Sequence, residues 1–565
     1  MAVSVLANLL ANLWHLISNA LRRLLGRPPG FVWLEISGAL PEFETPAGFL
    51  RRRVNRGPGP VTLQTLRERL GRISLDGRVR GVVLRIKDVE AGWAALEEAR
   101  GELLAFREGG GRVVAYLADP VDTRSYYLAC AADEVLAAPL VTVGVTGVRT
   151  RVSFFKEALD RLGIGAEVVA VSPYKSAGEP FTRNDFSREA REQAQRLLDG
   201  RYQEVLRAIR ESRGLTEAEA RDAIDGAPYG PEEAVAARLL DGVLYEDGLP
   251  ERLAAGGERP RIAEWAAAKK SLKVPYRRRV RRRIGLVQVS GTIMRGRSRR
   301  VPVPIPFLGG ERAGSESVVA TLRGAEKNRR VGAVLLHVES PGGDALASDL
   351  IWREVGRISA KKPVVVLMGN VAASGGYYVS APAAHVVARR STVTGSIGVI
   401  TIRPVADRLY GSLGINPVGL ERGERAGLMD PSRRPTEDEL RVLERQIGRI
   451  YDEFKGRVAR GRSLPGLDGI AGGRVWSGAE ALDLGLVDGV GGFREAFRRA
   501  RELGGIGEGS PAEVLLRVPV PRTGRPAPGE PAEVVEEIVG GLRREFLELP
   551  GRVWAMGPYG IRDDW

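Results

Sequence analysis

Two serine-containing turns in the second half of the chain combine small residues with a position beside an apolar strand. Ser374 lies in Ala-Ala-Ser-Gly-Gly-Tyr (372–377), directly after the Val/Leu-rich run 363–370. A serine at a strand-to-helix turn exposes its hydroxyl group and aims the next backbone N–H at a developing oxyanion. Thr394-Gly-Ser396-Ile-Gly-Val is a further turn of small residues. This pattern predicts a nucleophilic serine with polar groups arranged around it.

A glycine-rich turn follows another apolar strand of the same half. The segment His337-Val-Glu339-Ser-Pro-Gly-Gly343 ends in paired glycines after a proline. Glycine lets the backbone approach a ligand closely, and successive N–H groups can then face an anionic oxygen. The turn therefore predicts a segment whose backbone N–H groups can face a ligand closely.

A serine nucleophile needs a proton acceptor, and the second half has no lysine between Lys362 and Lys455. Arg425 cannot serve, because a guanidinium stays protonated. The first half offers Lys175, which has few charged neighbours apart from Glu179. A free lysine has a pKa of about 10.4, so burial or nearby dipoles must lower it before the amine can act as a base. Glu179 would oppose that shift if it faced the amine.

Two histidines are alternative bases, and one threonine is an alternative nucleophile. His337 ends an apolar strand, and His385 follows Ser374 in an Ala/Val-rich setting. Thr123 is flanked by Asp122 and Arg124 instead of small residues. Residue types and spacing alone leave these residues as alternatives to Lys175 and Ser374.

The chain consists of two copies of one unit. Five segment pairs recur in the same order: 79–86 with 331–338, 112–119 with 363–370, 125–133 with 376–384, 161–164 with 412–415, and 229–243 with 476–490. The offset is 251 or 252 positions for most pairs and 247 for the last. Chance similarity of apolar strands explains one pair but not five in order, so the pattern indicates a tandem duplication.

The duplication predicts an active site that is shared between the copies. Ser374 corresponds to Thr123, and Lys175 corresponds to Ala426. Each copy has therefore kept one part of the machinery. The copies must pack so that the amine and the hydroxyl group lie within about 2.6–3.2 Å of each other.

Buried Val/Leu strands alternate with amphipathic helices in each copy, which predicts an α/β fold with parallel strands. The segments 187–212 and 436–460 have helical apolar periodicity, and Thr436 with Glu439 forms a capping box. We expect the following organisation: a helix in 1–30, a first copy in 31–270, a basic linker in 271–283, a second copy in 284–500, and a Pro/Gly-rich tail in 501–565 with a short helix near 532–546.

The N-terminal segment 2–21 is mostly apolar, with one polar stripe made of Asn8, Asn12, His15 and Asn19. The basic residues that follow are Arg22, Arg23 and Arg27. This pattern is typical of a helix in the membrane interface or of a short membrane anchor, and no removable signal peptide is expected. The alternative is an amphipathic helix packed on the protein itself or on a sister subunit.

Composition excludes several classes of protein. With 43% hydrophobic and 27% charged residues the chain is globular, and its net charge is +15. The single cysteine, Cys130, excludes an intrachain disulfide and a cysteine-based zinc site, and three histidines offer little for another metal. No cofactor and no metal are expected. Zinc-finger spacing, RNA-binding aromatic strands and basic zippers are missing from the sequence, so no nucleic-acid partner is expected.

The turns SPGG (340–343), AASGGYY (372–378) and GSIGV (395–399), together with YKSAGEPF (174–181), resemble the long, duplicated form of the signal peptide peptidase A (protease IV) family over roughly residues 31–500. The resemblance implies a Ser-Lys serine protease. Its two units would have the Clp/crotonase-like fold and pack as a pseudo-dimer. The Clp relatives place a histidine about two dozen residues after the nucleophile, where this chain has Val399.

The resemblance also assigns roles to individual residues. It implies that Ser374 is the nucleophile, Lys175 the general base and Ser396 the residue that orients the lysine. The oxyanion hole would consist of the backbone N–H groups of Gly343 and Gly375.

The family further implies a homotetramer at the bacterial cytoplasmic membrane. Its substrates would be short hydrophobic peptides, chiefly the remnants of cleaved signal peptides. Two alternatives remain open. A crotonase-like acyl-CoA hydratase or isomerase would need a second carboxylate besides Glu339, and an inactive protease could serve as a membrane scaffold.

Overall fold

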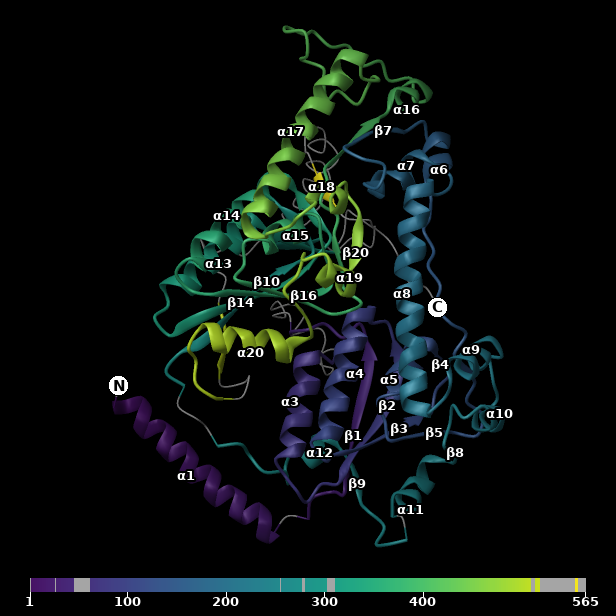
Figure 1. Cartoon of the computed structure of the whole chain (residues 1–565), viewed down its shortest axis with the longest axis vertical. Helices are drawn as coiled ribbons and strands as arrows, with labels where there is room; N and C mark the ends of the chain where they lie inside the picture. The colour runs from purple at the N-terminus through teal and green to yellow at the C-terminus, as the bar shows by residue number, and fades with distance from the viewer. Residues whose placement is uncertain are drawn as a thin grey trace.

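The computed structural model describes residues 2–25, 27–44, 61–254, 256–276, 280–301, 310–509, 514–518 and 554–556. Both copies are α/β units, and the N-terminal copy occupies the lower half of the view in Figure 1. The helix expected near 532–546 lies outside the described residues.

The N-terminal copy is built on a parallel sheet in the order β8-β5-β3-β2-β1-β9. Its strands are β1 (Phe31–Gly38), β2 (Gly81–Val89), β3 (Arg112–Leu117), β5 (Glu134–Ala137), β8 (Gly242–Val243) and β9 (Ile262–Glu264). Its helices are α3 (Leu63–Ser74), α4 (Trp93–Glu108), α5 (Thr123–Ala129), α9 (Glu217–Asp225), α10 (Pro231–Ala236), α11 (Leu249–Ala254) and α12 (Trp265–Ala268), and β4 (Val121–Asp122) pairs with β6 (Val143–Gly144).

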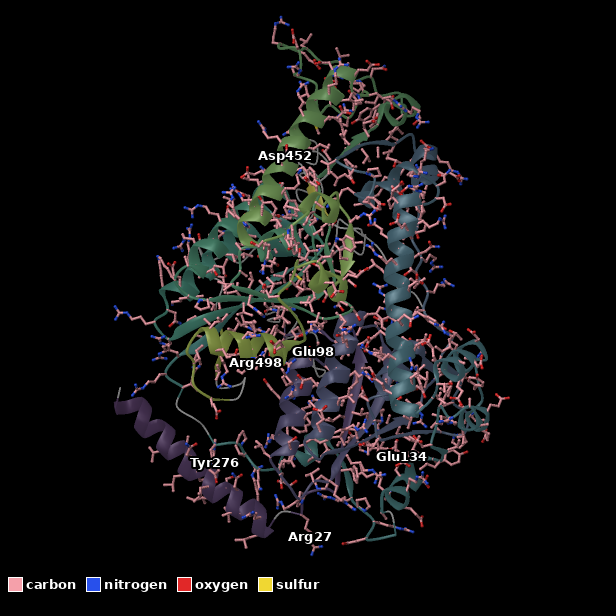
Figure 2. The ribbon with its side chains drawn as sticks, viewed as in Figure 1. Arg27, Glu98, Glu134, Tyr276, Asp452 and Arg498 are labelled. Atoms are coloured by element: carbon pink, nitrogen blue, oxygen red, sulfur yellow. The ribbon has the colours of Figure 1, made fainter. Side chains whose placement is uncertain are left out.

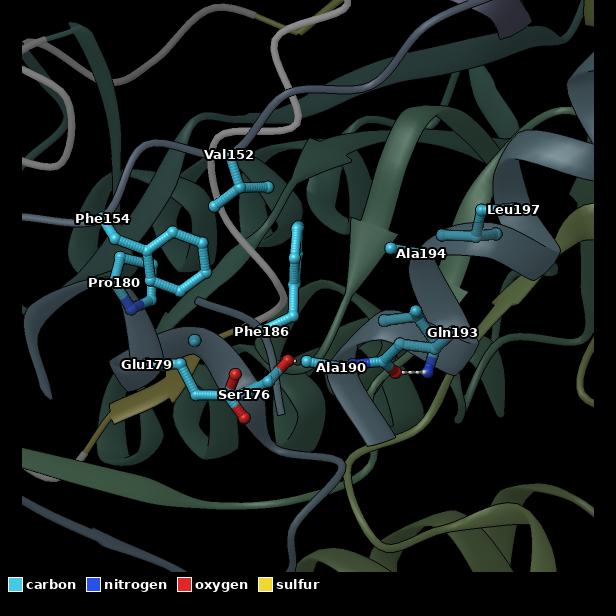
Figure 3. Close-up of a pocket in the computed structure, with 12 residues that line it drawn as sticks. Val152, Phe154, Ser176, Glu179, Pro180, Phe186, Ala190, Gln193, Ala194 and Leu197 are labelled. Carbon is cyan, nitrogen blue, oxygen red and sulfur yellow. Dashed lines mark hydrogen bonds between the residues drawn. The ribbon is translucent and has the colours of Figure 1, made fainter. Parts of the chain in front are cut away.

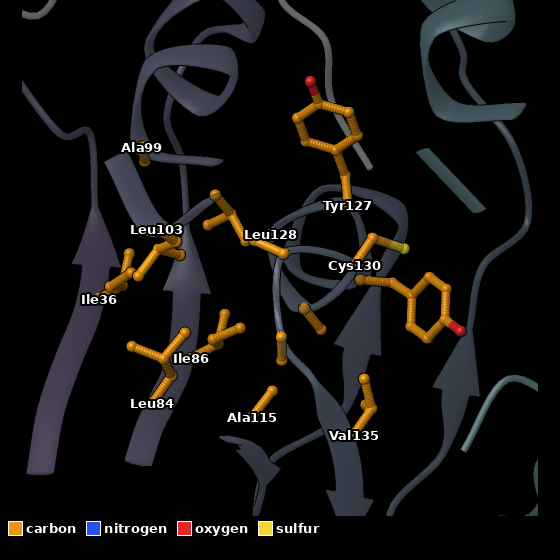
Figure 4. Packing of buried hydrophobic residues seen from close by; sticks show 14 of the residues in the cluster. Ile36, Leu84, Ile86, Ala99, Leu103, Ala115, Tyr127, Leu128, Cys130 and Val135 are labelled. Carbon is orange, nitrogen blue, oxygen red and sulfur yellow. The ribbon is translucent and has the colours of Figure 1, made fainter. Parts of the chain in front are cut away.

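Both faces of this sheet are buried, which explains why its strands are continuous apolar runs. Leu84 and Ile86 contribute to the larger core cluster, whereas Val83 on the opposite face contributes to a second cluster. Figure 4 shows Leu84 and Ile86 of β2 beside Leu103 of α4. Cys130, the single cysteine, is buried in the same core.

The C-terminal copy repeats this arrangement in the order β22-β10-β14-β16-β17-β21. Its strands are β10 (Arg283–Ser290), β14 (Val331–Ser340), β16 (Val364–Ala373), β17 (His385–Ala388), β21 (Gly489–Val490) and β22 (Leu515–Arg517), and β18 (Val393–Gly395) and β20 (Val475–Ser477) extend it. Its helices are α13 (Ser315–Lys327), α14 (Ala345–Ser359), α15 (Gly375–Ser380), α16 (Asp407–Ser412), α17 (Glu437–Gly461), α18 (Leu467–Ile470), α19 (Gly478–Asp483) and α20 (Phe493–Leu503).

The second copy extends past residue 500, where the sequence predicts that the repeat stops. Helix α20 continues to Leu503, and β22 pairs in parallel with β10 as β9 pairs with β1. The sheet of the C-terminal copy therefore includes a strand at residues 515–517. A strand of three residues is too short to show an apolar period, so nothing in the sequence separates it from the tail.

A third sheet joins the two copies. Its order is β12-β13-β11-β15-β23-β19-β7. The strands are β7 (Gly165–Ala170), β11 (Thr292–Met294), β12 (Arg299–Val301), β13 (Gly310–Gly314), β15 (Gly342–Asp344), β19 (Ile400–Val405) and β23 (Trp554–Met556). Strand β7 belongs to the N-terminal copy, yet it pairs antiparallel with β19 from Gly165 opposite Val405 to Ala170 opposite Ile400.

Strand β7 and its neighbours extend away from the N-terminal copy. In Figure 1, β7, α6 (Lys156–Arg161) and α7 (Glu179–Thr182) lie beside α16 and α17 of the other copy. The long helix α8 (Arg188–Arg213) then returns to the body of the N-terminal copy. Its ends match the sequence: Ser187 accepts a hydrogen bond as the N-cap, and Gly214 adopts the left-handed conformation after the last turn.

A buried network of charges also joins the copies. Glu98 of α4 accepts hydrogen bonds from Arg67 (2.7 Å), from the Nε atom of Arg389 (2.9 Å) and from the backbone N–H of Phe493. Arg389 also pairs with Glu42. Figure 2 shows Glu98 where α4 meets the C-terminal copy. Burial alone would raise the pKa of Glu98, but the two guanidinium groups lower it to about 2.

The N-terminal helix α1 (Ala2–Leu25) packs on the body through its polar stripe. His15 lies 3.1 Å from the carbonyl oxygen of Pro275, and Asn19 exchanges two hydrogen bonds with the backbone of Val274. The apolar side faces away from these contacts, with Trp14 68% exposed and Leu24 82% exposed. Among the helices in the described ranges, α1 included, none combines the length and the apolar character needed to cross a bilayer.

Candidate active site

The side chains of Lys175, Ser374 and Ser396 meet at the junction of the two copies. The Nζ atom of Lys175 lies 2.7 Å from Ser374 Oγ, 3.0 Å from Ser396 Oγ and 2.9 Å from the carbonyl oxygen of Ser396. All three residues are buried. The amine of one copy thus contacts the hydroxyl group of the other at hydrogen-bond distance.

Ser374 lies between β16 and α15 in a backbone conformation that is rare for a residue with a side chain. Its φ of 54° and ψ of −114° lie outside the regions that L-residues favour. The adjoining contacts hold it there: its N–H donates to the carbonyl oxygen of Gly395 over 2.8 Å, and its own carbonyl oxygen accepts from Tyr378. Ser396 also has a positive φ, 52°. Strain of this kind costs about 1–3 kcal/mol and gathers at functional sites.

Lys175 reaches Ser374 because β7 adds to the sheet of the other copy. After the last β7–β19 pair at Ala170, the chain turns and presents the lysine to the C-terminal copy. The carbonyl oxygen of Gly472 accepts a hydrogen bond from Ser172, and the backbone of Gly473 packs so closely that a Cβ atom there would lie 2.7 Å from Lys175 Cβ.

Burial lowers the pKa of Lys175 well below its ordinary value. Because desolvation disfavours the charged amine, the neutral form becomes available to accept a proton. Glu179, the one acidic neighbour in sequence, accepts hydrogen bonds from the backbone N–H and hydroxyl group of Ser187 instead. It therefore does not stabilise the ammonium form by a direct pair.

The two histidines lie elsewhere in the fold. His337 packs edge-to-face against Phe43, with ring centroids 5.3 Å apart, and burial lowers its pKa to about 3. His385 begins β17, and burial also lowers its pKa. The hydrogen bond to Ser374 Oγ in the described part of the chain comes from Lys175.

The backbone at Gly343 and Gly375 has room for no side chain. At Gly343, where φ is +156°, a Cβ atom would lie 2.0 Å from the carbonyl oxygen of Ile293. At Gly375 it would lie 2.6 Å from Ser348 Oγ and 3.2 Å from the backbone nitrogen of Gly343. The two glycine segments therefore approach each other directly beside the serine.

Glu339 and Thr123 have structural partners of their own. The carboxylate of Glu339 accepts hydrogen bonds from the backbone N–H groups of Asn370 (2.8 Å) and Val371 (3.2 Å). It thereby fixes the irregular part of β16 ahead of Ser374. Thr123 begins α5, and its hydroxyl group donates to the carbonyl oxygen of Gly147 over 2.7 Å.

Two supports of the site are not evident from sequence motifs. Gln193 of α8 is buried, and its side-chain amide donates hydrogen bonds to the Tyr174 carbonyl oxygen and to Ser176 Oγ. Its Oε1 atom accepts a hydrogen bond from the backbone N–H of Val475 over 3.4 Å. It ties the lysine segment to the other copy. The second support is the Gly472–Gly473 turn described above. A paired glycine before β20 is its signal, but glycine pairs are too common to identify it.

An apolar pocket lies beside the lysine segment. Figure 3 shows Val152, Phe154, Phe186 and Leu197 around it, with Ser176 at one side. Ser176 and Ala177, which follow Lys175 in the sequence, are among the residues that line it. Its walls suit an apolar side chain.

Comparisons with known proteins match both copies. The model of peptidase family S49 matches residues 105–258 and 357–507. The chain is 32% identical over 469 residues to "Serine protease SPPA, chloroplastic" of Arabidopsis thaliana, covering 81% of this chain and 67% of that protein. It is 33% identical to "Protease 4" of Haemophilus influenzae over 76% of this chain and 71% of that protein.

Solved structures that match include a ClpP1 mutant from Listeria monocytogenes, with 16% identity, a TM-score of 0.24 and coverage of 37% of this chain and 93% of that chain. The family match over both copies, together with the long relatives, leads to one conclusion: this chain belongs to the S49 family of serine peptidases.

Proposed function

We propose that this chain is a Ser-Lys endopeptidase that cleaves short hydrophobic peptides. The observation that carries the proposal is the contact of Lys175 Nζ with Ser374 Oγ at 2.7 Å and with Ser396 Oγ at 3.0 Å. The lowered pKa of the buried lysine supports a role as general base.

In the proposed reaction, Lys175 accepts the proton of the Ser374 hydroxyl group as the oxygen attacks the carbonyl carbon of a peptide bond. The negative charge that develops on the carbonyl oxygen is stabilised by the backbone N–H groups of Gly343 and Gly375. The protonated lysine then gives its proton to the leaving amine. Water, activated by the same amine, releases the acyl group from the serine. Throughout the reaction, the hydroxyl group of Ser396 keeps the amine of Lys175 oriented towards Ser374 Oγ.

Two features of the structure support the proposed substrate class. The pocket lined by Phe154, Phe186 and Leu197 favours apolar side chains, and α1 presents an exposed apolar face. We infer that α1 lies in the interface of a membrane, with Arg22 and Arg23 near anionic headgroups. Remnants of cleaved signal peptides are apolar peptides found at that surface, and they are the substrates that we propose.

We also propose that copies of the chain associate, as the expected homotetramer requires. Beyond α16, the segment 413–420 exposes four apolar side chains: Leu413 (62%), Ile415 (49%), Val418 (87%) and Leu420 (96%). Apolar side chains this exposed and this close in sequence are typical of an interface. Analytical ultracentrifugation of wild type against Leu420→Asp tests this assignment, because a charge at an interface should reduce the oligomer to smaller species.

The proposed function is tested with Ser374→Ala and Lys175→Met in the full chain. Each variant should lose about a thousandfold or more of kcat on a fluorogenic apolar peptide, because the two groups act as a unit. Circular dichroism and size-exclusion chromatography establish that the variants fold. Lys156→Met is the control, since Lys156 forms an i,i+4 pair with Asp160 at the surface.

Two results would contradict the proposal. Full activity of Lys175→Met at neutral pH would exclude the lysine as the base. Failure of wild type to react with a serine-directed fluorophosphonate would favour the inactive scaffold, whereas turnover of an acyl-CoA by wild type would favour the hydratase.

A further inference from the structure

Strand β16 contains an irregular stretch shortly before Ser374. The regular register of β14 and β16 breaks between Val338 and Ser340 of β14. At this point Glu339 alone lies opposite three residues of β16, 369–371. A bulge of this kind leaves backbone N–H groups without partners in the neighbouring strand and re-aims the residues that follow it. The direction in which β16 delivers the serine therefore depends on how these residues are held.

The carboxylate of Glu339 supplies the missing partners. Its Oε2 atom accepts hydrogen bonds from the backbone N–H of Asn370 over 2.8 Å and from the side-chain amide of Asn370 over 3.2 Å. Its Oε1 atom accepts from the backbone N–H of Val371 over 3.2 Å. The backbone also packs closely on this carboxylate, because a Cβ atom at Gly369 would lie 2.0 Å from Oε2. One side chain thus holds the whole irregular stretch.

Asn370 connects the same stretch to the N-terminal copy. Its Oδ1 atom accepts a hydrogen bond from the backbone N–H of Ala95 over 3.0 Å. Ala95 is the third residue of α4, and the residue that precedes this helix, Gly92, makes no side-chain cap. A Cβ atom at Gly92 would lie 2.3 Å from Asn370 Oδ1. Asn370 therefore caps the first turn of a helix that belongs to the other copy.

Glu339 lies where both functional turns leave the sheet. It directly precedes the turn 340–343, which contains Gly343, and its carboxylate binds Val371 three residues before Ser374. The side chain therefore links the strand that leads to the proposed oxyanion donor with the strand that leads to the proposed nucleophile. A displacement of about 1 Å between reacting groups can lower a rate about a hundredfold.

We propose that Glu339 and Asn370 are positioning residues of the peptidase. The carboxylate fixes Ser374 relative to the Gly343 turn, and the amide links that position to α4 of the other copy. Both residues act through the backbone of β16 and not on the reacting atoms. This inference rests on the proposed function, because a positioning role has a meaning only for a reaction at Ser374.

The contacts are tested without catalysis by hydrogen–deuterium exchange of the full chain. Glu339→Gln keeps the length of the side chain but has one oxygen acceptor, so exchange at residues 370 and 371 should be about tenfold or more faster than in wild type. Asn370→Ala should have the same effect at Ala95. Thr216→Ala is the matched control, because it removes the N-cap of the peripheral helix α9 and should leave these amides unchanged. Equal rates in wild type and both variants would overturn the proposal.

Kinetics distinguish a positioning role from a purely structural one. Glu339→Gln and Asn370→Asp, which places a second carboxylate beside Glu339, should each lower kcat on an apolar peptide about tenfold to a hundredfold. KM should stay within about twofold, because the serine is misplaced and the binding of the peptide is not. The rate at which Ser374 reacts with a serine-directed fluorophosphonate should fall by the same factor as kcat. Thr216→Ala should match wild type in all three quantities.

Swapping the two groups provides the rescue. The double variant Glu339→Gln/Asn370→Asp restores a hydrogen bond between an amide and a carboxylate with both side-chain lengths kept, so its kcat should exceed that of either single variant. Single variants with the kcat of wild type, or a double variant no faster than the single ones, would overturn the positioning role. Wild type that neither cleaves the peptide nor reacts with the fluorophosphonate would instead overturn the proposed function, and the exchange rates would still decide whether the two residues hold β16.

Discussion

The amine of Lys175 lies 2.7 Å from the hydroxyl oxygen of Ser374, although 199 positions of sequence separate the two residues. One residue belongs to each copy of the repeated unit. The distance is set by the β7–β19 pairing and by the way the copies pack. Anything that loosens the contact between the copies should therefore act on activity as well as on stability.

The lowered pKa of Lys175 predicts how the activity and the stability of the protein depend on pH. Since burial lowers the pKa of its amine well below the ordinary value, kcat/KM should rise as pH increases through that lowered pKa, and the rise should be complete well below the pH at which an ordinary lysine loses its proton. A pH–rate profile of wild type measures this. A limb that rises only near pH 10 would mean that the lysine is not the base.

The same lowered pKa means that burying the amine of Lys175 decreases the free energy of unfolding. In the unfolded chain the lysine keeps its proton up to about pH 10.4, so at any pH between the lowered pKa of the folded protein and that value folding releases a proton and costs free energy. Lys175→Met removes this cost. Its gain in unfolding free energy over wild type should shrink by about 1.4 kcal/mol for each pH unit between the lowered pKa of the folded protein and about pH 10. Urea titrations at several pH values measure the gain, and a gain that does not change with pH would contradict the shift.

The hydroxyl group of Ser396 should matter separately from its backbone conformation. Ser396→Ala and Ser396→Gly both remove the oxygen that lies 3.0 Å from Lys175, but glycine also relieves the positive φ. Both variants should lose about tenfold to a hundredfold of kcat with little change in KM. If only the alanine variant lost activity, the role of Ser396 would be conformational.

The charge network between the copies should be costly to break. Glu98→Gln leaves Arg67 and Arg389 buried with less compensation, so the free energy of unfolding should fall by about 3–5 kcal/mol. Peptidase activity should fall with it, because the dyad spans both copies. Glu437→Gln is the control, since Glu437 is 93% exposed and lies 3.9 Å from Arg441.

The contribution of this charge network to stability should also decrease at low pH. Glu98 has a pKa near 2 in the folded protein, which is below its unfolded value. Its stabilising contribution is therefore complete above about pH 4.5 and is lost as pH falls towards 2. The difference in unfolding free energy between wild type and Glu98→Gln should shrink over that window. A difference that stays constant down to pH 2 would contradict the assignment.

The glycine at position 343 should be irreplaceable for a steric reason. Gly343→Ala places a Cβ atom 2.0 Å from the carbonyl oxygen of Ile293, so the segment must move. Displacing an oxyanion donor costs about a hundredfold to a thousandfold in kcat. Gly296→Ala is the control: its φ is also positive, at +85°, but no atom lies within 4 Å. Equal activity of the two variants would exclude a role for Gly343.

The exposed apolar face of α1 should bind a lipid surface. A Leu13→Asp/Trp14→Asp chain should sediment with anionic phospholipid vesicles about tenfold or more weakly than wild type, because both side chains are more than half exposed on that face. Leu140→Asp, at a 94% exposed leucine of the N-terminal copy, is the control. Wild type that does not sediment with vesicles would exclude the membrane role.

Much of the fold can be predicted from local sequence. The helix expected at 436–460 is α17 (Glu437–Gly461), and its capping box of Thr436 and Glu439 is present. The expected strand at 331–338 is β14. Apolar periodicity and helix caps depend on residues that lie a few positions apart, so both can be recognised in the sequence. The duplication is likewise visible, because it leaves paired segments at a nearly constant offset.

The sequence by itself therefore determined two α/β copies and the residue types that chemistry requires, Ser374 in one copy and Lys175 in the other. Only the tertiary structure decided that β7 crosses to the neighbouring copy, that β22 completes the second sheet and that β23 lies beside Gly343. The physical reason is the long sequence separation between the strands that pair. Pairing between short strands hundreds of residues apart is selected by the packing of whole elements, and three-residue strands carry no periodic signal of their own.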